Sequence, residues 1–489
     1  MSGPGASEAT EPADPASPRR ETGTFVTGSI MRHVVVMTAT GSIGLVAAFV
    51  VDALNLFYIS MLGQQELAAA IGYSGTLLFF TTSVSIGLSI AATALTARAL
   101  GRGNRGEARE IAGASIVYML VLTTITAAAA WPSIGFLVHL IGARGETAAL
   151  ATEFLQIVIP SMPVLGVGMC LAALLRATGD ARRAMYVTLS GAALTAVLDP
   201  LFIFGFELGI HGAAIASVIS RFALIVVGFH GLVRVHNLLA RPSRAVLLRD
   251  YRPYLGIGLP AVMTLVATPV GNTFVTATIA AHGDAAVAGW AVVGRLIPLA
   301  FGPLFALSGA VGPILGQNYG ARRYDRLRRT MRDSLVFILI YTLVAWAMLA
   351  LLRNQIADLF GATGEAREVI VFFCLFVAAS FIFNGMLFVA NAAFNNLGFA
   401  LYSTVFNWSR STLGVIPFVW LGSTWYGATG ALAGFGLGAV VFGLAAIVVC
   451  FRVIGRIGDS DGTPPDPSQT IRTPPAAQSP FTSGKASTL

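Results

Sequence analysis

Two aspartates lie deep inside strongly apolar stretches of the sequence, where an ionised side chain is unfavourable unless it has a function. Asp52 follows the run LVAAFVV, and Asp199 follows the run AALTAVL. An acid near the centre of a bilayer raises the free energy of insertion by about 2.5–3.5 kcal/mol. Each of these two acids therefore indicates a functional site.

Oxygen-bearing groups are expected at the same depth as the aspartates. Thr195 precedes Asp199 by about one helical turn, and Ser217 lies in the next apolar stretch. Pro200 has no N–H, so one backbone carbonyl a turn earlier lacks its helical donor. Carboxylates, hydroxyls and a free carbonyl suit a proton relay or a small hard cation such as Na⁺. The sequence thus predicts a cation-coupling site made of Asp52, Asp199, Thr195 and Ser217.

A structural role is the alternative interpretation of these acids. Each aspartate would then be capped by a neighbouring group and would hold helices together. Arg221, one turn beyond Ser217, is the candidate basic partner in this half of the chain. An acid without a basic partner stabilises a membrane interior poorly, which favours the functional interpretation.

The composition determines what kind of elements must position these residues. Of 489 residues, 55% are hydrophobic and 11% are charged, and the mean hydropathy is +0.76. Soluble domains carry about 25% charged residues, so a soluble, disordered or coiled-coil protein is excluded. We expect an all-α integral membrane protein with twelve transmembrane helices. Their ranges are about 34–62, 67–97, 111–140, 149–175, 184–206, 211–233, 254–280, 285–317, 334–352, 369–394, 399–421 and 428–452.

The arginines predict the orientation of these spans. Loops after spans 2, 4, 6 and 8 are rich in arginine, whereas the odd-numbered loops hold only Arg144, Arg353 and Arg367. The positive-inside rule then places both termini in the cytoplasm, in a multi-pass protein of the cell membrane, here the bacterial inner membrane. Basic residues confined to short loops do not indicate nucleic-acid binding. Residues 1–30 and 458–489 are polar and rich in Pro, Ser and Gly, which predicts disordered cytoplasmic tails without a signal peptide.

An internal repeat divides the spans into two halves. LGRGNRGEARE (100–110) after span 2 matches YGARRYDRLRR (319–329) after span 8. The repeat predicts an N-lobe (31–235, spans 1–6), a cytoplasmic linker (236–253) and a C-lobe (254–457, spans 7–12). Six spans per half give both lobes the same orientation, related by a pseudo-twofold axis along the membrane normal. The C-lobe counterparts of Asp52 and Asp199 are Asn272 and Phe418, so the acids belong to one lobe only.

The C-lobe carries a different set of polar residues inside its spans. We expect these residues to be candidates for lining a substrate cavity, although the arginines could equally pair with backbone carbonyls or extend toward the interface. No nucleotide, metal or nucleophile motif accompanies them, so the sequence predicts neither an enzyme nor a cofactor beyond the coupling ion. The candidates are Asn272, Arg295, Asn384, Asn391, Asn407 and Arg410.

Three stretches make the chain similar to the multidrug and toxic compound extrusion (MATE) family, over about residues 31–455. They are VVDALNLFYISMLGQQELAAA (50–70), LDPLFIFGFELGIHGAAIAS (198–217) and GPILGQNYGARRYDR (312–326). The resemblance implies a twelve-helix, two-lobe secondary antiporter. Such a protein expels organic, cationic or amphipathic compounds in exchange for H⁺ or Na⁺.

Within the family the chain resembles the DinF-like branch, in which the cation site lies in the N-lobe. The acids of spans 1 and 5 in that branch fall on Asp52 and Asp199, and its span 6 hydroxyl falls on Ser217. Its asparagine one turn before the span 5 acid is replaced by Thr195, which favours H⁺ over Na⁺. The resemblance also implies helix bending during transport. The residues suited to it are Gly41, Gly44, Pro200 and Pro260.

Three other functions stay open on the sequence. A lipid-linked oligosaccharide or polysaccharide flippase of the same superfamily would share the fold but need a wide basic cavity. A transporter of the major facilitator type is disfavoured, because the loop after span 2 lacks the pattern Gly-x-x-x-Asp-Arg-x-Gly-Arg. A structural or receptor protein would not explain acids in one lobe only. The expected partners are small molecules and the lipid bilayer, with no nucleic acid, and the expected state is a monomer.

Overall fold

The computed structural model describes residues 23–63 and 65–459, and every regular element in these ranges is a helix. The predicted all-α membrane fold is therefore confirmed. Most of the two predicted tails lies outside the described residues. Residues 24–30, which the first tail was expected to include, form a short 3₁₀ turn (Thr24–Val26) and the start of the first long helix.

The first half of the chain makes six passes. Two of them are interrupted by a 3₁₀ turn that contains a proline, Pro132 or Pro160, because proline removes a helical hydrogen bond. The helices are α1 (Ile30–Ser60), α2 (Gln65–Gly101), α3 (Arg105–Ala130) with α4 (Ile134–Leu140), α5 (Gly145–Val158) with α6 (Met162–Thr178), α7 (Ala181–Pro200) and α8 (Gly209–Phe229). Short π-helices, Leu201–Gly205 and His230–Val235, extend α7 and α8.

The second half also makes six passes. Its helices are α9 (Arg244–Ala280), α10 (Asp284–Gly320), α11 (Tyr324–Leu359), α12 (Gly364–Phe372) with α13 (Phe381–Leu397), α14 (Ala400–Ser409) and α15 (Ile416–Asp459). Helix α9 begins at Arg244, so residues 244–253 of the expected linker are helical. A π-helix, Arg410–Gly414, connects α14 to α15.

Helix α15 contains parts of two spans. Its backbone leaves the helical region at Tyr426 and Gly427, where Gly427 takes a φ of 63° that favours glycine. The two arms then pack against each other through glycines, with Gly422 against Gly430 and Gly438 against Gly414. The eleven long apolar segments found by length and hydropathy therefore correspond to the twelve predicted spans, because the segment 400–458 crosses twice.

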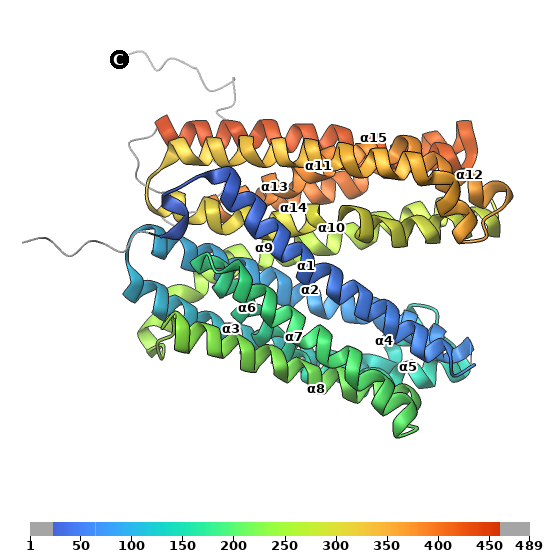
Figure 1. Cartoon of the computed structure of the whole chain (residues 1–489), viewed down its shortest axis with the longest axis horizontal. Coiled ribbons are helices and arrows are strands. Elements are labelled where there is room, and N and C mark those ends of the chain that lie inside the picture. Colours follow the sequence, from blue (N-terminus) through green and yellow to red (C-terminus); the bar gives the residue numbers. More distant parts are fainter. Residues whose placement is uncertain (1–22, 64, 460–489) are drawn as a thin grey trace, which may run out of the picture.

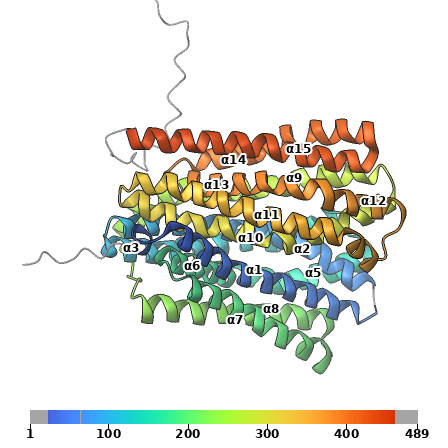
Figure 2. The same cartoon turned by 45° about the horizontal axis from the view of Figure 1, so that its top comes forward.

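The passes form two lobes that lie side by side. In Figure 1, α1 to α8 form the lower body and α10 to α15 the upper one. In the turned view of Figure 2, α15 lies at one edge of the molecule and α7 and α8 lie at the opposite edge. The N-lobe and C-lobe touch mainly where α1 packs on α10 and where α2 packs on α9 and α10.

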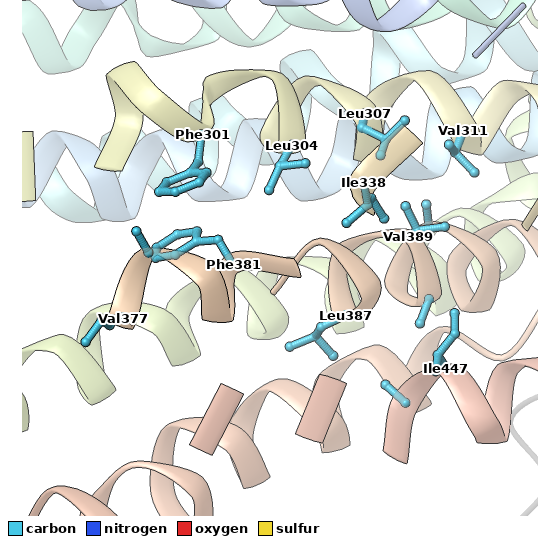
Figure 3. Packing of buried hydrophobic residues seen from close by; sticks show 14 of the residues in the cluster. Phe301, Leu304, Leu307, Val311, Ile338, Val377, Phe381, Leu387, Val389 and Ile447 are labelled. Carbon is cyan, nitrogen blue, oxygen red and sulfur yellow. The ribbon is translucent and has the colours of Figure 1, made fainter. Parts of the chain in front are cut away.

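Apolar packing gives the C-lobe a dense interior. Figure 3 shows side chains of α10, among them Leu304 and Leu307, facing side chains of α11 and α13, with Ile447 of α15 on the other side of α13. The rings of Phe301 and Phe381 stack with centroids 4.1 Å apart. Close packing of this kind resists deformation, so the C-lobe is expected to move as one body.

Candidate cation site and the contacts between the lobes

Asp199 lies where α1 and α7 pack against each other, and its side chain is fully buried (0% exposed). Its Oδ2 accepts a hydrogen bond of 2.9 Å from Nδ2 of Asn55 on α1. Its Oδ1 has no hydrogen-bond partner among the described residues. A buried carboxylate with a free oxygen is costly, so this position is suited to bind a proton or a cation.

Asp52 lies one turn before Asn55 on α1 and is exposed. Asn55 bonds to Asp199, and Asp52 is on the same side of α1, so the two carboxylates face the same region between α1 and α7. Within residues 23–63 and 65–459, no ion pair involves either acid. The structure therefore brings Asp52, Asn55 and Asp199 together, and two acids share this site without a basic partner from the described chain.

Arg221 was the candidate partner for these acids, and it bonds elsewhere. Its guanidinium donates to the carbonyl of Val158, at 2.9 Å, and to the hydroxyl of Ser161. These contacts join α8 to the break between α5 and α6. The described contacts thus give no support to neutralisation of the acids by Arg221.

The two predicted hydroxyls are half-buried on the neighbouring helices. Thr195 Oγ1 donates to the carbonyl of Gly191 at 3.0 Å, one turn earlier in α7, which leaves its lone pairs free. Ser217 lies on α8, which packs along α7. Neither hydroxyl bonds to Asp52 or Asp199 in the described part of the chain.

The backbone changes its winding directly after Asp199. Pro200 ends α7, and residues Leu201–Gly205 form a π-helix in which the N–H of Phe206 donates to the carbonyl of Leu201 at 2.9 Å. Proline cannot donate to the preceding turn, so the wider π turn takes up the resulting misfit. Such single π turns occur often at functional sites.

Asn55 was missed by the sequence analysis. It follows Asp52 by three positions, in the sequence DALN, so both side chains lie on one side of α1. That spacing was visible, but only the packing of α1 on α7 reveals that the amide reaches Asp199. An amide of this kind stabilises the ionised acid without neutralising its charge.

The C-lobe candidates separate into two groups. Asn272 and Arg295 are exposed, whereas the other four are buried, with Arg410 6% exposed. Arg410 Nη1 lies 3.4 Å from Oδ1 of Asn384, and its Nε has no partner among the described residues. Asn391 and Asn407 belong to the same internal polar layer between α13 and α14. The hydroxyl of Ser403 donates to the backbone carbonyl of Asn391 at 3.2 Å, and Nδ2 of Asn407 donates to the backbone carbonyl of Ser403 at 2.7 Å.

Of the residues expected to allow bending, Gly41, Gly44 and Pro260 lie inside continuous helices, whereas Pro200 ends α7. Gly41 of α1 faces Ala306 of α10, and Gly44 faces Thr188 of α7. Helix α9 continues through Pro260, whose carbonyl accepts hydrogen bonds of 2.8 Å from the hydroxyls of Thr264 and Thr404. Small residues and satisfied carbonyls at these positions let neighbouring helices approach closely.

One end of the bundle, called the arginine end here, carries the loops after spans 2, 4, 6 and 8. At this end Gln317 of α10 joins the lobes: its Nε2 donates to the carbonyl of Ala177, at 2.7 Å. Arg98 of α2 donates to the carbonyls of Asn396, at 2.9 Å, and Asn395, at 3.3 Å. These bonds close the arginine end.

A segment before α1, residues 24–28, adds to this closure and is called the N-terminal clasp. Thr24 donates to the carbonyl of Thr178 in the N-lobe, at 2.9 Å. Phe25 is 1% exposed among C-lobe side chains, and its N–H donates to Gln317 Oε1 at 2.8 Å. Arg326 donates to the carbonyl of Phe25 at 3.0 Å. The clasp therefore binds both lobes.

The opposite end of the bundle differs. The ribbons of the two lobes diverge toward it in Figure 1. Along α1 and α10, the outermost close approach at a glycine is that of Gly302 to Val46, near the middle of both helices. Farther out, Asp52 of α1 and Arg295 of α10 are both exposed. The lobes are thus packed together at the arginine end and apart at the other end.

Two matches to one family model fall on the two lobes separately. The MatE family model matches residues 42–201 and residues 260–421, which together make up more than half of the chain. The chain belongs to the MATE family. Both acids lie in the first matched region of this MATE protein, and the second region contains their counterparts Asn272 and Phe418.

Characterised relatives cover most of the MATE chain. It is 26% identical over 435 residues to the FAD transporter of Shewanella oneidensis. This alignment covers 88% of this chain and 96% of the relative. It is 23% identical to the multidrug export protein MepA of Staphylococcus aureus, with coverage of 85% and 92%.

Solved structures confirm the two-lobe fold. A mutant of the Vibrio cholerae MATE transporter VcmN matches with a TM-score of 0.83, at 23% identity, over 87% of this chain and 97% of that one. A MOP superfamily transporter from Pyrococcus furiosus matches with a TM-score of 0.81, at 21% identity, over 88% and 98%. The chain is therefore a multi-pass membrane transporter with the twelve-helix fold that the sequence predicted.

Proposed function

We propose that this MATE protein is a secondary active efflux antiporter of the DinF-like kind, which exchanges organic compounds for H⁺ or Na⁺. The observation that carries the proposal is Asp199, which is fully buried, has one oxygen without a partner among the described residues, and bonds to Asn55 one turn from a second acid, Asp52. Two ionised carboxylates in apolar surroundings repel each other, so a proton or small cation bound between them is stabilised.

The ion site is built from Asp52, Asn55 and Asp199, with Thr195 and Ser217 as further oxygens. Thr195 carries no amide at a position where the resemblance implies one, which favours H⁺ as the coupling ion. A membrane potential contributes about 2.3 kcal/mol per charge per 100 mV. One cation entering per cycle therefore supports a substrate gradient of more than tenfold.

The closed arginine end identifies the state that the structure represents. Arginines favour the cytoplasmic side, so this end and both chain termini face the cytoplasm of the bacterial inner membrane. The diverging end then faces outward, where substrate leaves and the coupling ion enters. Rocking of the lobes requires that the bonds of Gln317, Arg98 and the N-terminal clasp break in each cycle.

The substrates are small organic compounds taken up by a monomer from the cytoplasm or the bilayer. Multidrug export by the relative MepA supports cationic or amphipathic compounds. Export of a flavin nucleotide is a second candidate, supported by the 26% identity with an FAD transporter over nearly the whole chain. Of the C-lobe candidates, the exposed Asn272 and Arg295 are assigned to the path between the lobes, and the buried four to the internal polar layer.

Exchange in proteoliposomes tests the proposal. The purified protein is reconstituted, and efflux of a fluorescent organic cation or of FAD is followed with a pH gradient, a Na⁺ gradient or neither. We expect gradient-dependent transport that Asp52→Asn and Asp199→Asn abolish, while both variants still insert and elute as folded protein. Gradient-independent movement of a lipid-linked oligosaccharide, with no exchange of small molecules, would instead assign a flippase.

A further inference from the structure

The contact between α1 and α10 continues, in register, to two opposite charges that do not touch. The two helices run antiparallel, since numbers rise along α1 as they fall along the facing side of α10. Gly41 faces Ala306, and farther out Val46 faces Gly302. This pairing defines which residues lie at equal depth on the two helices.

The same register places Asp52 opposite Arg295. Asp52 lies six positions beyond Val46, about 9 Å along α1, and Arg295 lies seven positions before Gly302, about 10 Å along α10. Asp52 is eleven positions from Gly41, about three turns, so it shares the side of α1 that meets α10. Arg295 is two turns from Gly302, so it shares the side of α10 that meets α1.

Both charges are exposed on the facing sides of α1 and α10 that the register defines. Arg295 is exposed eleven positions into α10 from Asp284, about 16 Å from the start of the helix. A guanidinium at that depth is very unfavourable in lipid, so its exposed face must meet a polar space. Neither Asp52 nor Arg295 has an ion pair in residues 23–63 and 65–459, because the lobes diverge at this level.

We propose that Asp52 and Arg295 form an ion pair between the lobes when the outer end closes. This inference rests on the proposed alternation of the lobes. Closing the outer end continues the α1–α10 contact past Val46 and Gly302 and brings the two charges together. In the state seen here the two charges form no ion pair within the described residues, and Asp52 lies one turn from Asn55, the hydrogen-bond partner of Asp199.

The carboxylate of Asp52 then has two alternative positive partners, the coupling cation and Arg295. In the outward-open state the site is free to take up the coupling cation. In the closed state Arg295 compensates Asp52, and a cation bound at Asp52 competes with Arg295 for the same carboxylate. Arg295 is therefore a positioning residue that links occupancy of the site to the movement of the lobes, rather than an anchor for substrate.

Cross-linking tests the juxtaposition directly. Asp52→Cys and Arg295→Cys are combined in a chain whose natural cysteines, Cys170, Cys374 and Cys450, are replaced by alanine. A protease site is added between the π-helix His230–Val235 and α9, so that a cross-link keeps the two cleaved halves together on a gel. A bifunctional thiol reagent about as long as an arginine side chain is applied to membranes.

We expect the double variant to cross-link, with a yield at least tenfold above that of the control pair Asp52→Cys with Ile297→Cys. Ile297 lies two positions from Arg295, on the side of α10 that packs against the C-lobe core. Equal yields from the two pairs would overturn the inference. Because cross-linking needs no transport, this result is independent of whether the protein exports drugs.

Coupling measurements separate a gate from a substrate anchor. We expect Arg295→Gln to raise ion flux without substrate severalfold and to leave substrate affinity within about twofold, while Arg295→Lys keeps exchange coupled. A loss of substrate affinity with unchanged coupling would overturn the inference in favour of an anchor. Failure of the proposed antiport itself would appear differently, as unchanged exchange in Asp52→Asn and Asp199→Asn.

Discussion

The two lobes have one scaffold but differ in which buried charged group lacks an oppositely charged partner among the described residues. The N-lobe has a buried carboxylate, Asp199, with no basic partner among the described residues. The C-lobe has a buried guanidinium, Arg410, with no acidic partner there. Helix count, orientation and glycine contacts are duplicated, whereas the polar groups are not. The difference indicates that packing was retained in both copies while ion chemistry was confined to one.

Replacing the buried acid Asp199 is expected to have the largest effect on exchange. Asp199→Asn keeps the shape and the contact with Asn55 but removes the charge, so exchange should fall more than a hundredfold. The measurement is substrate counterflow in proteoliposomes. A double variant, Asp52→Asn with Asn272→Asp, moves an acid to the equivalent place in the C-lobe. If that variant restored exchange, the lobes would be chemically interchangeable and the contrast would fail.

A second prediction tests how tightly the two lobes pack at the arginine end. A Cβ at Gly320 would lie 2.1 Å from the carbonyl oxygen of Arg98, so Gly320→Ala should disfavour the packed state by about 1–3 kcal/mol. We expect a thiol placed at this end to react at least five times faster in the variant. Gly309→Ala on the same helix is the control, since no atom lies within 4 Å there. Equal reactivity would contradict the assigned closure.

A smaller effect is expected at the loop between α6 and α7. Asp180 caps α7 through the N–H of Arg183, at 3.0 Å, and also contacts His236, at 2.8 Å. Burial raises the pKa of Asp180, but the hydrogen bonds from Arg183 and His236 outweigh burial and hold it below its usual value. The stability that this group contributes is present above the unfolded pKa of about 3.9 and is lost as the pH falls through the folded value.

Asp180→Ala should therefore lower the free energy of unfolding at pH 7 by about 1 kcal/mol. Asp180→Asn keeps the cap and should lose less. Thermal unfolding in detergent measures both. We expect the deficit of the asparagine variant to stay constant from pH 7 to pH 5 and to shrink only below about pH 4. If the loss of unfolding free energy became larger as the pH fell, the hydrogen-bonded carboxylate of Asp180 could not be its cause.

The smallest effect is expected in the C-lobe. Among the described residues, Arg410 has one side-chain hydrogen bond, of 3.4 Å, and its Nε has no partner, so Arg410→Met removes a poorly compensated charge. Replacing such a group by an apolar one of similar volume is often neutral or stabilising. Exchange should change less than threefold, and the unfolding temperature should stay the same or rise. Lost substrate binding would instead show that both lobes contribute charged groups to transport.

Much of this architecture follows from local sequence patterns. Apolar runs of the right length predicted the spans, and the repeat of LGRGNRGEARE as YGARRYDRLRR predicted the two lobes. The start of α9 at Arg244 was missed because helical residues beyond the apolar run carry no hydropathy signal. The N-terminal clasp was also missed, because residues 24–28 were assigned to a disordered tail. Phe25 bonds to a residue about 290 positions away, so the local sequence gives no sign of this contact.

The site was predictable as chemistry but not as geometry. Asp52 and Asp199 stand out because acids are rare in apolar runs. The bond from Asn55 to Asp199 and the alignment of Asp52 with Arg295 depend on how α1 packs against α7 and α10. Pairings between distant helices leave no periodic trace in one sequence. The π turn after Pro200 could be predicted in part, because the proline indicates an interruption of the helix but not that the interruption is a π-helix.

The N-terminal clasp has a consequence for how the protein is made. Residues 24–28 leave the ribosome early, but the groups that hold them, Gln317 and Arg326, are synthesised roughly 300 residues later. A nascent chain with only its first lobe inserted has nothing against which to seat Phe25. The permeability barrier on that side is thus completed late in biogenesis, after the second lobe has entered the membrane.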